Sequence, residues 1–503
     1  MQVLGTIISR EDSPSTSQFL FVLDKHNDSV KKGQFIQVNT SDGDLFGYVN
    51  ELFRANRYYE MAESVAEYEK SGPGTMGTNF PVNEWEYALG EVKILGKFNR
   101  GKFLRTYSPP APGAKVYLAD NSILHGFLGF SESGLAVGNI QHHELEAKLD
   151  LSRLFQKHLA ILAMSGAGKS HLASVLIEEL LKRKKEDGRI AVVVIDIHGE
   201  YIGFKFDEKF GAKTTLVDAS EISLPPKKVS SEMFEEWLPN LSIPQRELLR
   251  QAIGSLRKSE GAYGLKDIAI KLEDEDLAHD NVKKTLKRSL RELARYGFLK
   301  QGKENPNLLR DVRPGEILLL DFSTIDSIRK KQILVSMVAR RLFKLRKKEK
   351  IPPFLLLIEE AHNFAREKAE ASEAISKGII ETIAREGRKF GASLCLITQR
   401  PVNLSTTALS QCSTHIILRI TNPNDLDHIQ MSSEGIDSRV AKSITSLRIG
   451  EAIFVGEAVN YPIFVNIRQR QSTKREKGQP LHEQAKHFEE TQKKKEEQVE
   501  AFL

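Results

Sequence analysis

Cysteine is scarce in this chain, which has two among its 503 residues, Cys395 and Cys412. Both lie in apolar runs, so buried thiols are expected rather than a disulfide or a metal site. The chain also has no apolar run of about 18 residues, the length that a transmembrane helix needs. Its first residues, MQVLGTIISRED, lack the basic start and apolar stretch of a signal peptide. These absences predict a cytoplasmic protein with no membrane partner.

Glycine and proline are not in excess, with 34 and 18 residues, and charged residues make up 28% of the chain. This composition is typical of folded globular proteins. The length predicts about two or three domains. The net charge of +6 permits a polyanionic partner but does not require one.

Residues 1–138 contain short apolar runs separated by turn clusters such as HNDS and SDGD. This pattern predicts a small N-terminal β-barrel. The segment YYEMAESVAEYEK (58–70) predicts a helix inserted into it. The expected strands are QFLFVL (18–23), QFIQV (34–38), LFGYVN (45–50), EVKILGKF (91–98) and AKVYLA (114–119).

Apolar strands alternate with helices in residues 139–224 and 308–472. The strands, such as VVVID (192–196), are continuously apolar, as expected of parallel strands covered on both faces, so we predict an α/β core with a parallel-rich sheet. Residues 225–307 have helical periodicity and predict an inserted helical subdomain. The charged stretch 473–503 is either a disordered tail or an arm that docks on a partner, and its composition favours disorder.

The segment SGAGKS (165–170) follows a predicted strand and opens a predicted helix, which is the context of a phosphate-binding loop. Its backbone amides can surround phosphate oxygens, Lys169 can reach the β- and γ-phosphates, and Ser170 can ligate Mg²⁺. Ala163 stands where the usual pattern opens with glycine, and we expect little effect because alanine is also small. The residues assigned to ATP are Ser165, Gly166, Ala167, Gly168, Lys169, Ser170 and His171.

A second element, FLLLIEEAHNF (354–364), is an apolar strand that ends in two carboxylates. We assign Glu359 to Mg²⁺, through water, and Glu360 to polarising the attacking water. The alternative is a helix that happens to start with acidic residues, which are favoured there. Gln399, at the tip of another strand, is expected to sense the γ-phosphate. Asp196 and Glu200, near the end of VVVID, are candidates for contacts around the metal, whereas His198 is expected to be structural.

Two arginines in ETIAREGRKFGAS (381–393) are three residues apart, which predicts that Arg385 and Arg388 share one face of a helix. An arginine that reaches a neighbouring subunit's nucleotide is worth about 10³–10⁵ in rate. The alternative is an ordinary pair of surface arginines.

The stretches AILAMSGAGKS, VIDIHGEY, LLLIEEAHNF, IAREGRKFG and ITQRP, in this order, resemble the HerA family of hexameric DNA translocases, which is related to the FtsK pumps. The resemblance covers nearly the whole chain. It implies a RecA-like P-loop ATPase core and a barrel of the type found in rotary ATP synthases. It also implies a homohexameric ring that threads double-stranded DNA and acts with a NurA-type nuclease in resecting broken ends.

Several roles follow from that resemblance. Lys169 and Ser170 match the family's phosphate loop, Glu359 and Glu360 its acidic motif, and Gln399 its sensor. Arg385 or Arg388 matches the intersubunit arginine. Arg153 is a weaker candidate for a second arginine in trans, and the charged arm is similar to a tail that reaches over the adjacent subunit.

Duplex DNA in a ring would be gripped by basic loops that touch phosphates without reading bases. The candidates are Lys227, Lys228 and the clusters NVKKTLKRSLREL (281–293) and RRLFKLRKKEK (340–350), although each alone is better explained as a solvated face. No basic strand carries interleaved aromatics, so a single-strand stacking platform is not expected.

Other functions fit the sequence less well. A kinase lacks an evident acceptor pocket, a switch GTPase lacks an N-K-x-D-type stretch, and a transporter ATPase lacks an LSGGQ-like segment. A conjugation or secretion pump of the same superfamily, working without a repair nuclease, remains the alternative.

Overall fold

The computed structural model describes most of the chain, as two compact units. The described residues are 2–10, 13–24, 30–56, 86–99, 102–258, 261–274, 279–370, 373–433 and 438–474, with isolated positions elsewhere. Unit 1 comprises Met1–Glu179, Ala365–Lys368 and Glu381–Gln469, and unit 2 comprises Leu180–Phe364, Ala369–Ile380 and Arg470–Leu503. The helix predicted at 58–70 and most of the arm predicted at 473–503 lie outside the described residues.

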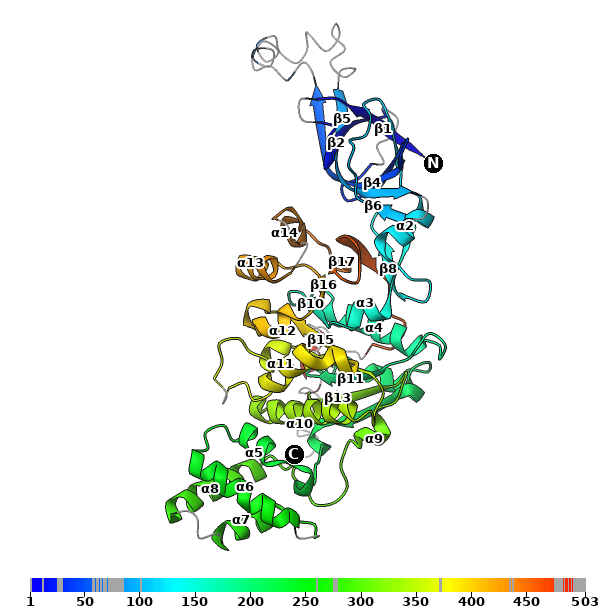
Figure 1. Cartoon of the computed structure of the whole chain (residues 1–503). Helices are drawn as coiled ribbons and strands as arrows, with labels where there is room; N and C mark the ends of the chain where they lie inside the picture. The colour runs from blue at the N-terminus through cyan, green and yellow to red at the C-terminus, as the bar shows by residue number, and fades with distance from the viewer. Residues whose placement is uncertain are drawn as a thin grey trace, which may run out of the picture. The chain divides into compact units, whose positions relative to one another are not determined.

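Unit 1 begins with a closed antiparallel barrel, as predicted (Figure 1). Six strands follow the order β2-β1-β7-β3-β4-β5, and pairing of β2 with β5 closes the ring, while β6 extends from β5. Phe19 and Phe21 are fully buried inside it. Gly90 makes room for this core, since a Cβ there would lie 2.3 Å from Cε1 of Phe21. The strands are β1 (Val3–Ile8), β2 (Gln18–Leu23), β3 (Phe35–Thr40), β4 (Gly43–Asn56), β5 (Glu86–Asn99), β6 (Lys102–Leu104) and β7 (Lys115–Leu118).

A second group of strands in unit 1 has the order β15-β10-β16-β17-β18-β8-β9. β10 is parallel to both β15 and β16, but the strands from β17 onward pair antiparallel. The sheet is therefore parallel-rich, as predicted, but not wholly parallel: the run EAIFVG (451–456) is antiparallel, because an apolar run indicates burial and carries no information on strand direction. The strands are β8 (Leu135–Ile140), β9 (Glu146–Leu149), β10 (Leu159–Leu162), β15 (Ala392–Thr398), β16 (Thr414–Ile417), β17 (Glu451–Gly456) and β18 (Ile463–Ile467).

The helices that begin in unit 1 are mostly short. They are α2 (Asn121–Leu128), α3 (Leu151–Phe155), α4 (Lys169–Lys182), α12 (Thr406–Ser410), α13 (Pro423–Ser432) and α14 (Ser438–Thr445). α4 follows the phosphate-binding loop directly. Its residues Leu172, Ala173, Leu176 and Ile177 are buried, so the helix that should carry the nucleotide is fixed by apolar packing.

Unit 2 contains four parallel strands in the order β12-β13-β11-β14. They are β11 (Ala191–Asp196), β12 (Thr214–Asp218), β13 (Ile317–Asp321) and β14 (Phe354–Ile358), and every residue of β11, β13 and β14 is buried. This confirms the predicted parallel strands. Because the strands are parallel and in register, Asp196 pairs with Asp321 at one shared edge.

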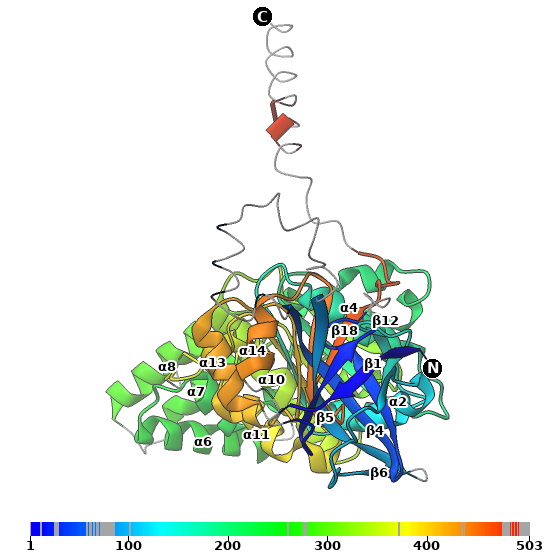
Figure 2. The same ribbon diagram turned by 90° about the horizontal axis from the view of Figure 1, so that it is seen from above.

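The helices of unit 2 include those predicted for the inserted segment. They are α5 (Ser231–Trp237), α6 (Ile243–Lys258), α7 (Leu265–Asp274), α8 (Asp280–Ala294), α9 (Leu308–Asp311) and α10 (Ile328–Lys347), and α11 (Lys377–Glu386) begins there. Figures 1 and 2 both draw α6, α7 and α8 beside one another. Trp237 is fully buried and packs edge-on against Phe234 and Phe298.

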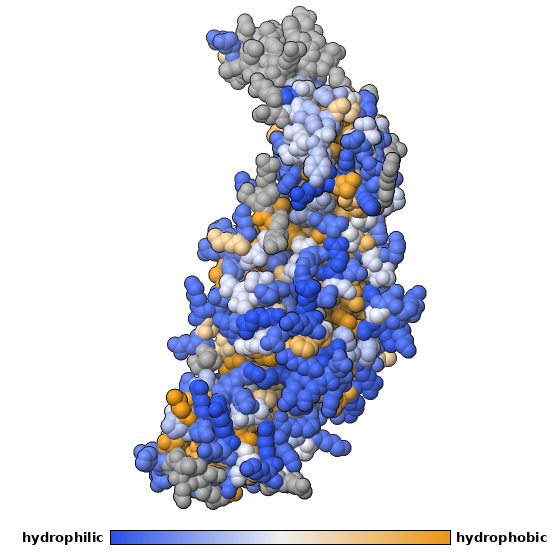
Figure 3. Space-filling model, in the orientation of Figure 1, coloured by the Kyte–Doolittle hydropathy of each residue, from blue (hydrophilic) through white to orange (hydrophobic). Residues whose placement is uncertain are grey.

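Hydrophilic residues predominate on the face drawn in Figure 3, where apolar residues form small groups. Within the described ranges, no helix combines the length and the apolarity that crossing a bilayer would take.

Candidate functional site

The predicted phosphate-binding loop lies between β10 and α4, at residues 163–168. Gly166 and Gly168 have φ angles of +77° and +105°, a backbone region that side chains with a Cβ rarely adopt. Apart from Gly166 and its two chain neighbours, no atom lies within 4 Å of the place a Cβ on Gly166 would take, so the loop leaves an open cradle. Lys169 and Ser170 stand on the first turn of α4, whose amides favour an anion. These residues fit the phosphates of a nucleotide.

Ala163 occupies the position where glycine opens the usual pattern. It is fully buried, and its N–H donates to the carbonyl oxygen of Thr398 over 3.2 Å. The position therefore needs a small side chain at the end of β10, and alanine meets that need.

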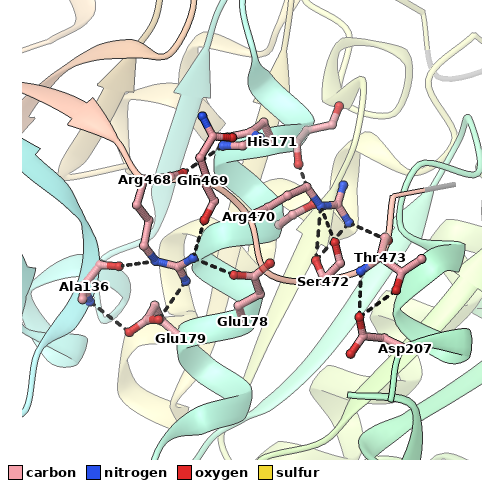
Figure 4. Close-up of polar contacts among 12 residues, drawn as sticks. Ala136, His171, Glu178, Glu179, Asp207, Arg468, Gln469, Arg470, Ser472 and Thr473 are labelled. Atoms are coloured by element: carbon pink, nitrogen blue, oxygen red, sulfur yellow. Dashed lines mark hydrogen bonds and ion pairs between the residues drawn. The ribbon is translucent and has the colours of Figure 1, made fainter. Parts of the chain in front are cut away.

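The imidazole ring of His171 contacts the protein rather than a ligand. Nε2 lies 2.9 Å from the carbonyl oxygen of Arg468, so this nitrogen carries the proton and donates it (Figure 4). The ring is thus engaged within unit 1. The backbone amide of His171 is the remaining candidate for contact with a nucleotide.

Gln399 follows β15 and faces the same cavity as the start of the loop. The cavity has a volume of about 430 Å³ and is lined by Met164, Ser165, Gln399, Arg400, Val402, Asn403, Ile420, Thr421, Asn422, Asn424 and Asp425. The structure therefore brings Gln399 and Ser165 together, as the sensor assignment requires.

In unit 2, the two predicted carboxylates directly follow β14. Glu359 is 3% exposed, and its Oε1 accepts a hydrogen bond of 2.9 Å from the hydroxyl of Tyr201. Burial raises the pKa of Glu359 well above the ordinary carboxyl value, and the charges of Asp196, Glu200 and Glu360 raise it further. The other oxygen, Oε2, is buried without a hydrogen-bond partner among the described residues.

Asp196 ends β11 and organises the loop that follows. It is fully buried, and it accepts hydrogen bonds from the backbone N–H groups of Glu200, over 3.0 Å, and Tyr201, over 2.9 Å. Burial raises the pKa of Asp196 despite these bonds. This loop places the fully buried Tyr201 against Glu359. Sequence reasoning does not identify Tyr201, because its partner is 158 positions away.

Glu360 has a backbone conformation unlike that of its neighbour. Its φ and ψ are both 46°, in the left-handed region, where residues other than glycine are uncommon. Its Oε2 lies 3.4 Å from Nδ1 of His362, and the residue is 7% exposed. The turn separates Glu360 from the extended strand that carries Glu359, so the two carboxylates have different surroundings.

Within the described ranges, no three acidic, histidine or cysteine side chains are arranged to hold a metal ion alone. Mg²⁺ in a nucleotide site takes one or two protein oxygens and completes its shell with phosphate and water. In unit 1, the hydroxyl of Ser170, on the first turn of α4, is an oxygen of this kind.

Comparison with known proteins decides the family. The chain is 31% identical to a probable helicase of Methanocaldococcus jannaschii, over 88% of this chain and 86% of that protein. It is 28% identical to the DNA double-strand break repair helicase HerA of Pyrococcus furiosus, over 87% and 88%. Residues 135–342 match the family described as helicase HerA, central domain. The chain belongs to the HerA family of helicases.

Solved structures share the fold of this HerA-family chain. VirB4 of Thermoanaerobacter pseudethanolicus superposes with a TM-score of 0.55 at 16% identity, covering 68% of this chain and 98% of VirB4. The plasmid coupling protein TrwB, in complex with a non-hydrolysable ATP analogue, gives 0.51 at 14% identity, covering 71% and 94%. Together with its family, this fold identifies the chain as an ATP-hydrolysing helicase.

The HerA-family chain differs from expectation at Arg388. α11 ends at Glu386, and Arg388 lies in the 3-10 turn η7 (Gly387–Phe390), so the two arginines do not share one helix. Gly387, directly after α11, allows a close approach of the chain, since a Cβ there would lie 2.2 Å from the carbonyl oxygen of Ala392. Both arginines are exposed, and Arg385 is 3.8 Å from Glu381.

Arg153 is fully engaged within unit 1. Its guanidinium donates to the carbonyl oxygens of Glu457 and Gly129, over 2.8 and 3.0 Å, and to Oδ1 of Asn460, over 2.8 Å. These bonds favour a structural role over the predicted role in trans.

The predicted basic pair after β12 is also engaged. Lys227 donates to the carbonyl oxygen of Gly261 over 3.2 Å, and Lys228 forms an ion pair of 2.7 Å with Glu304. These contacts within unit 2 give both lysines a structural role.

Proposed function

We propose that this HerA-family helicase is an ATP-driven motor that translocates on double-stranded DNA during the resection of broken ends. Support comes from relatives named DNA double-strand break repair helicase HerA, such as those of Pyrococcus furiosus and Sulfurisphaera tokodaii, which align over most of this chain. The observation that carries the proposal is the open glycine cradle ahead of Lys169 in a chain of this family.

The proposed chemistry assigns each side chain one task. Lys169 and the loop amides hold the β- and γ-phosphates of ATP, and Ser170 ligates Mg²⁺, with Glu359 reaching it through water. Mg²⁺ supplies charge neutralisation on the phosphates. Glu360 polarises the attacking water, a contribution of about 10²–10⁴ in rate. Gln399, which shares a cavity with Ser165, senses the γ-phosphate.

The protein would work as a homohexameric ring in the cytoplasm, with an arginine of one subunit completing the site of the next. Arg385 is the first candidate because it stands on regular helix and is exposed; Arg388 is the second. Cutting of the DNA belongs to a separate nuclease of the NurA type. Contacts with DNA phosphates make translocation sensitive to salt concentration and independent of the DNA sequence.

A first experiment compares ATP hydrolysis with and without duplex DNA, alongside the particle mass in solution. We expect a hexamer whose turnover rises with duplex DNA, and we expect Lys169→Ala to weaken nucleotide binding. A monomer whose turnover ignores DNA would overturn the motor proposal. Addition of a NurA-type nuclease then tests whether translocation is coupled to resection.

A second experiment mixes two inactive proteins, Lys169→Ala and Arg385→Ala. If Arg385 acts in trans, mixed rings contain interfaces that join an intact Lys169 to an intact Arg385, and part of the hydrolysis returns. If mixing restores nothing while the same mixture with Arg388→Ala does, the intersubunit role belongs to Arg388.

A further inference from the structure

The phosphate-binding loop has two different sides. β10 lies between β15 and β16, and it is parallel to both. Gln399 follows β15, so the proposed sensor for the terminal phosphate is on that side. On the other side, β17 pairs antiparallel with β16 and therefore starts at the edge where β10 ends. The turn at residues 448–450, which leads into β17, lies at this second side.

This turn is close to the loop and firmly held. A Cβ on Gly168 would lie 4.0 Å from the backbone nitrogen of Gly450. The N–H of Arg448 donates to Oε2 of Glu451 over 2.8 Å, and the N–H of Glu451 donates back to the carbonyl oxygen of Arg448 over 3.1 Å. Gly450 has a φ of +89°, which a residue with a Cβ would rarely adopt. The turn thus presents a fixed surface beside the cradle.

The end of β18 joins this turn to the first turn of α4. The carbonyl oxygen of Gly450 accepts from the N–H of Ile467 over 2.8 Å, and the next carbonyl, that of Arg468, accepts from His171. Arg468 is itself fixed by Glu178 and Glu179 of α4, at 2.8 Å each (Figure 4). We call residues 448–450, 467–468 and His171 the base rim, because they form a continuous hydrogen-bonded edge beside the loop.

Ile449 is the apolar member of the base rim. It is 76% exposed, whereas Leu447, two positions earlier, is 4% exposed. Single exposed apolar side chains are common on proteins. Ile449 differs by its position, on a rigid turn whose next residue approaches Gly168.

We propose that Ile449 is the platform for the base of the bound nucleotide and that the base rim forms the base subsite. The proposal rests on ATP binding at the phosphate loop. With the terminal phosphate toward Gln399, the ribose and base extend to the opposite side, over residues 448–450. Ligand sites are lined mainly by apolar side chains, which suit the flat face of a base. An isoleucine offers no hydrogen bond to the base edge, so we expect adenine and guanine to be accepted similarly.

The test compares ATP with inorganic tripolyphosphate, which has the phosphates but neither ribose nor base. In the full-length Ile449→Ser protein, we expect the KM for ATP to rise about tenfold, as loss of one buried apolar side chain implies, with kcat little changed. The inhibition constant of tripolyphosphate against ATP hydrolysis is expected to stay at the wild-type value. An unchanged KM for ATP, or an equal weakening of both ligands, would overturn the assignment.

Two controls complete the design. Ile449→Leu keeps an apolar platform and should retain the wild-type KM. Ile243→Ser removes an isoleucine that is 82% exposed on α6 in unit 2, and it should change neither constant. The proposed motor function is tested separately by Lys169→Ala: if that variant binds ATP as tightly as wild type, the loop is not the nucleotide site. If Lys169→Ala binds ATP more weakly while Ile449→Ser does not differ from wild type, only the base subsite is wrong.

Discussion

Two groups of buried carboxylates in this molecule have opposite electrostatic surroundings. In unit 1, Glu178 is fully buried and Glu179 nearly so, and both are paired with Arg468. In unit 2, Glu359 and Asp196 are also buried, but the described contacts of these two carboxylates come from backbone N–H groups and the Tyr201 hydroxyl. The first group is paired with a guanidinium within the fold, whereas the second carries acidic charge that burial disfavours.

This difference separates a structural cluster from a functional one. A buried charge is tolerated when a partner and hydrogen bonds compensate it. When neither suffices, the pKa shifts, as burial and neighbouring carboxylates raise the pKa of Glu359. Such uncompensated groups concentrate at functional sites. The acidic group is therefore suited to a cation that arrives with the nucleotide, and the arginine-paired group is suited to holding α4.

The largest expected effect tests the functional side of the comparison. Glu360→Gln removes the proposed base while keeping its shape, so ATP hydrolysis should fall by a factor of about 10²–10⁴. ATP binding, measured by equilibrium titration, should persist because Lys169 and the loop are untouched. Wild-type hydrolysis in this variant would assign the water-activating role to another group.

Breaking the structural cluster should reduce stability instead. Arg468→Met removes the ion pair of the fully buried Glu178, which costs about 3–5 kcal/mol in the free energy of unfolding. Chemical denaturation measures this loss. Arg246→Met is a matched control, since Arg246 donates only to the carbonyl oxygens of Leu241 and Pro239 among its described contacts. Equal losses in both variants would mean that the buried charge at Glu178 has no special cost.

Neutralising the acidic group should instead increase the free energy of unfolding. Because the pKa of Glu359 is raised in the folded protein, its contribution to stability is present at low pH and is lost as pH rises from the ordinary carboxyl range through the raised pKa. Glu359→Gln should therefore stabilise the nucleotide-free protein near neutral pH. Its melting temperature should also depend less on pH than that of wild type. A variant that melts lower than wild type at neutral pH would contradict the comparison.

The smallest effect concerns Tyr201. Tyr201→Phe removes the hydrogen bond to Oε1 of Glu359 and should cost about 1 kcal/mol of stability. It should also raise the pKa of Glu359 further, because the hydroxyl favours the ionised form. Calorimetry at two pH values checks both points. In the Glu359→Gln background the same substitution should have a different cost, and additivity of the two would show that the hydroxyl does not act through Glu359.

Local determinants made part of this molecule predictable. The phosphate loop is contiguous, with its strand, two glycines, Lys169 and Ser170 all within a dozen positions. The barrel strands and the helices of the inserted segment follow from the period of their apolar residues. The end of α11 was not predicted, although Gly387, a poor helix former, stands between the two arginines that were expected to share a helix.

The remaining features depend on distant contacts. The hydrogen-bond partners of Arg153, Glu457 and Asn460, lie about 300 positions away along the chain. The sequence therefore shows the arginine but does not indicate its partners. The antiparallel direction of β17 depends on how the chain returns after α13 and α14, which apolar runs do not encode. The same holds for Tyr201 and for the base rim, where three separate segments meet.

The left-handed turn at Glu360 has a consequence for variants of this protein. A glycine at this position would adopt the same φ of 46° at lower cost, so folding alone would select against the glutamate. In the proposed role of Glu360 as the base, keeping a carboxylate there lowers conformational stability in favour of catalysis. A Glu360→Gly protein should thus have a higher melting temperature than wild type while failing to hydrolyse ATP. The difference between the two melting temperatures would measure the stability that the glutamate costs.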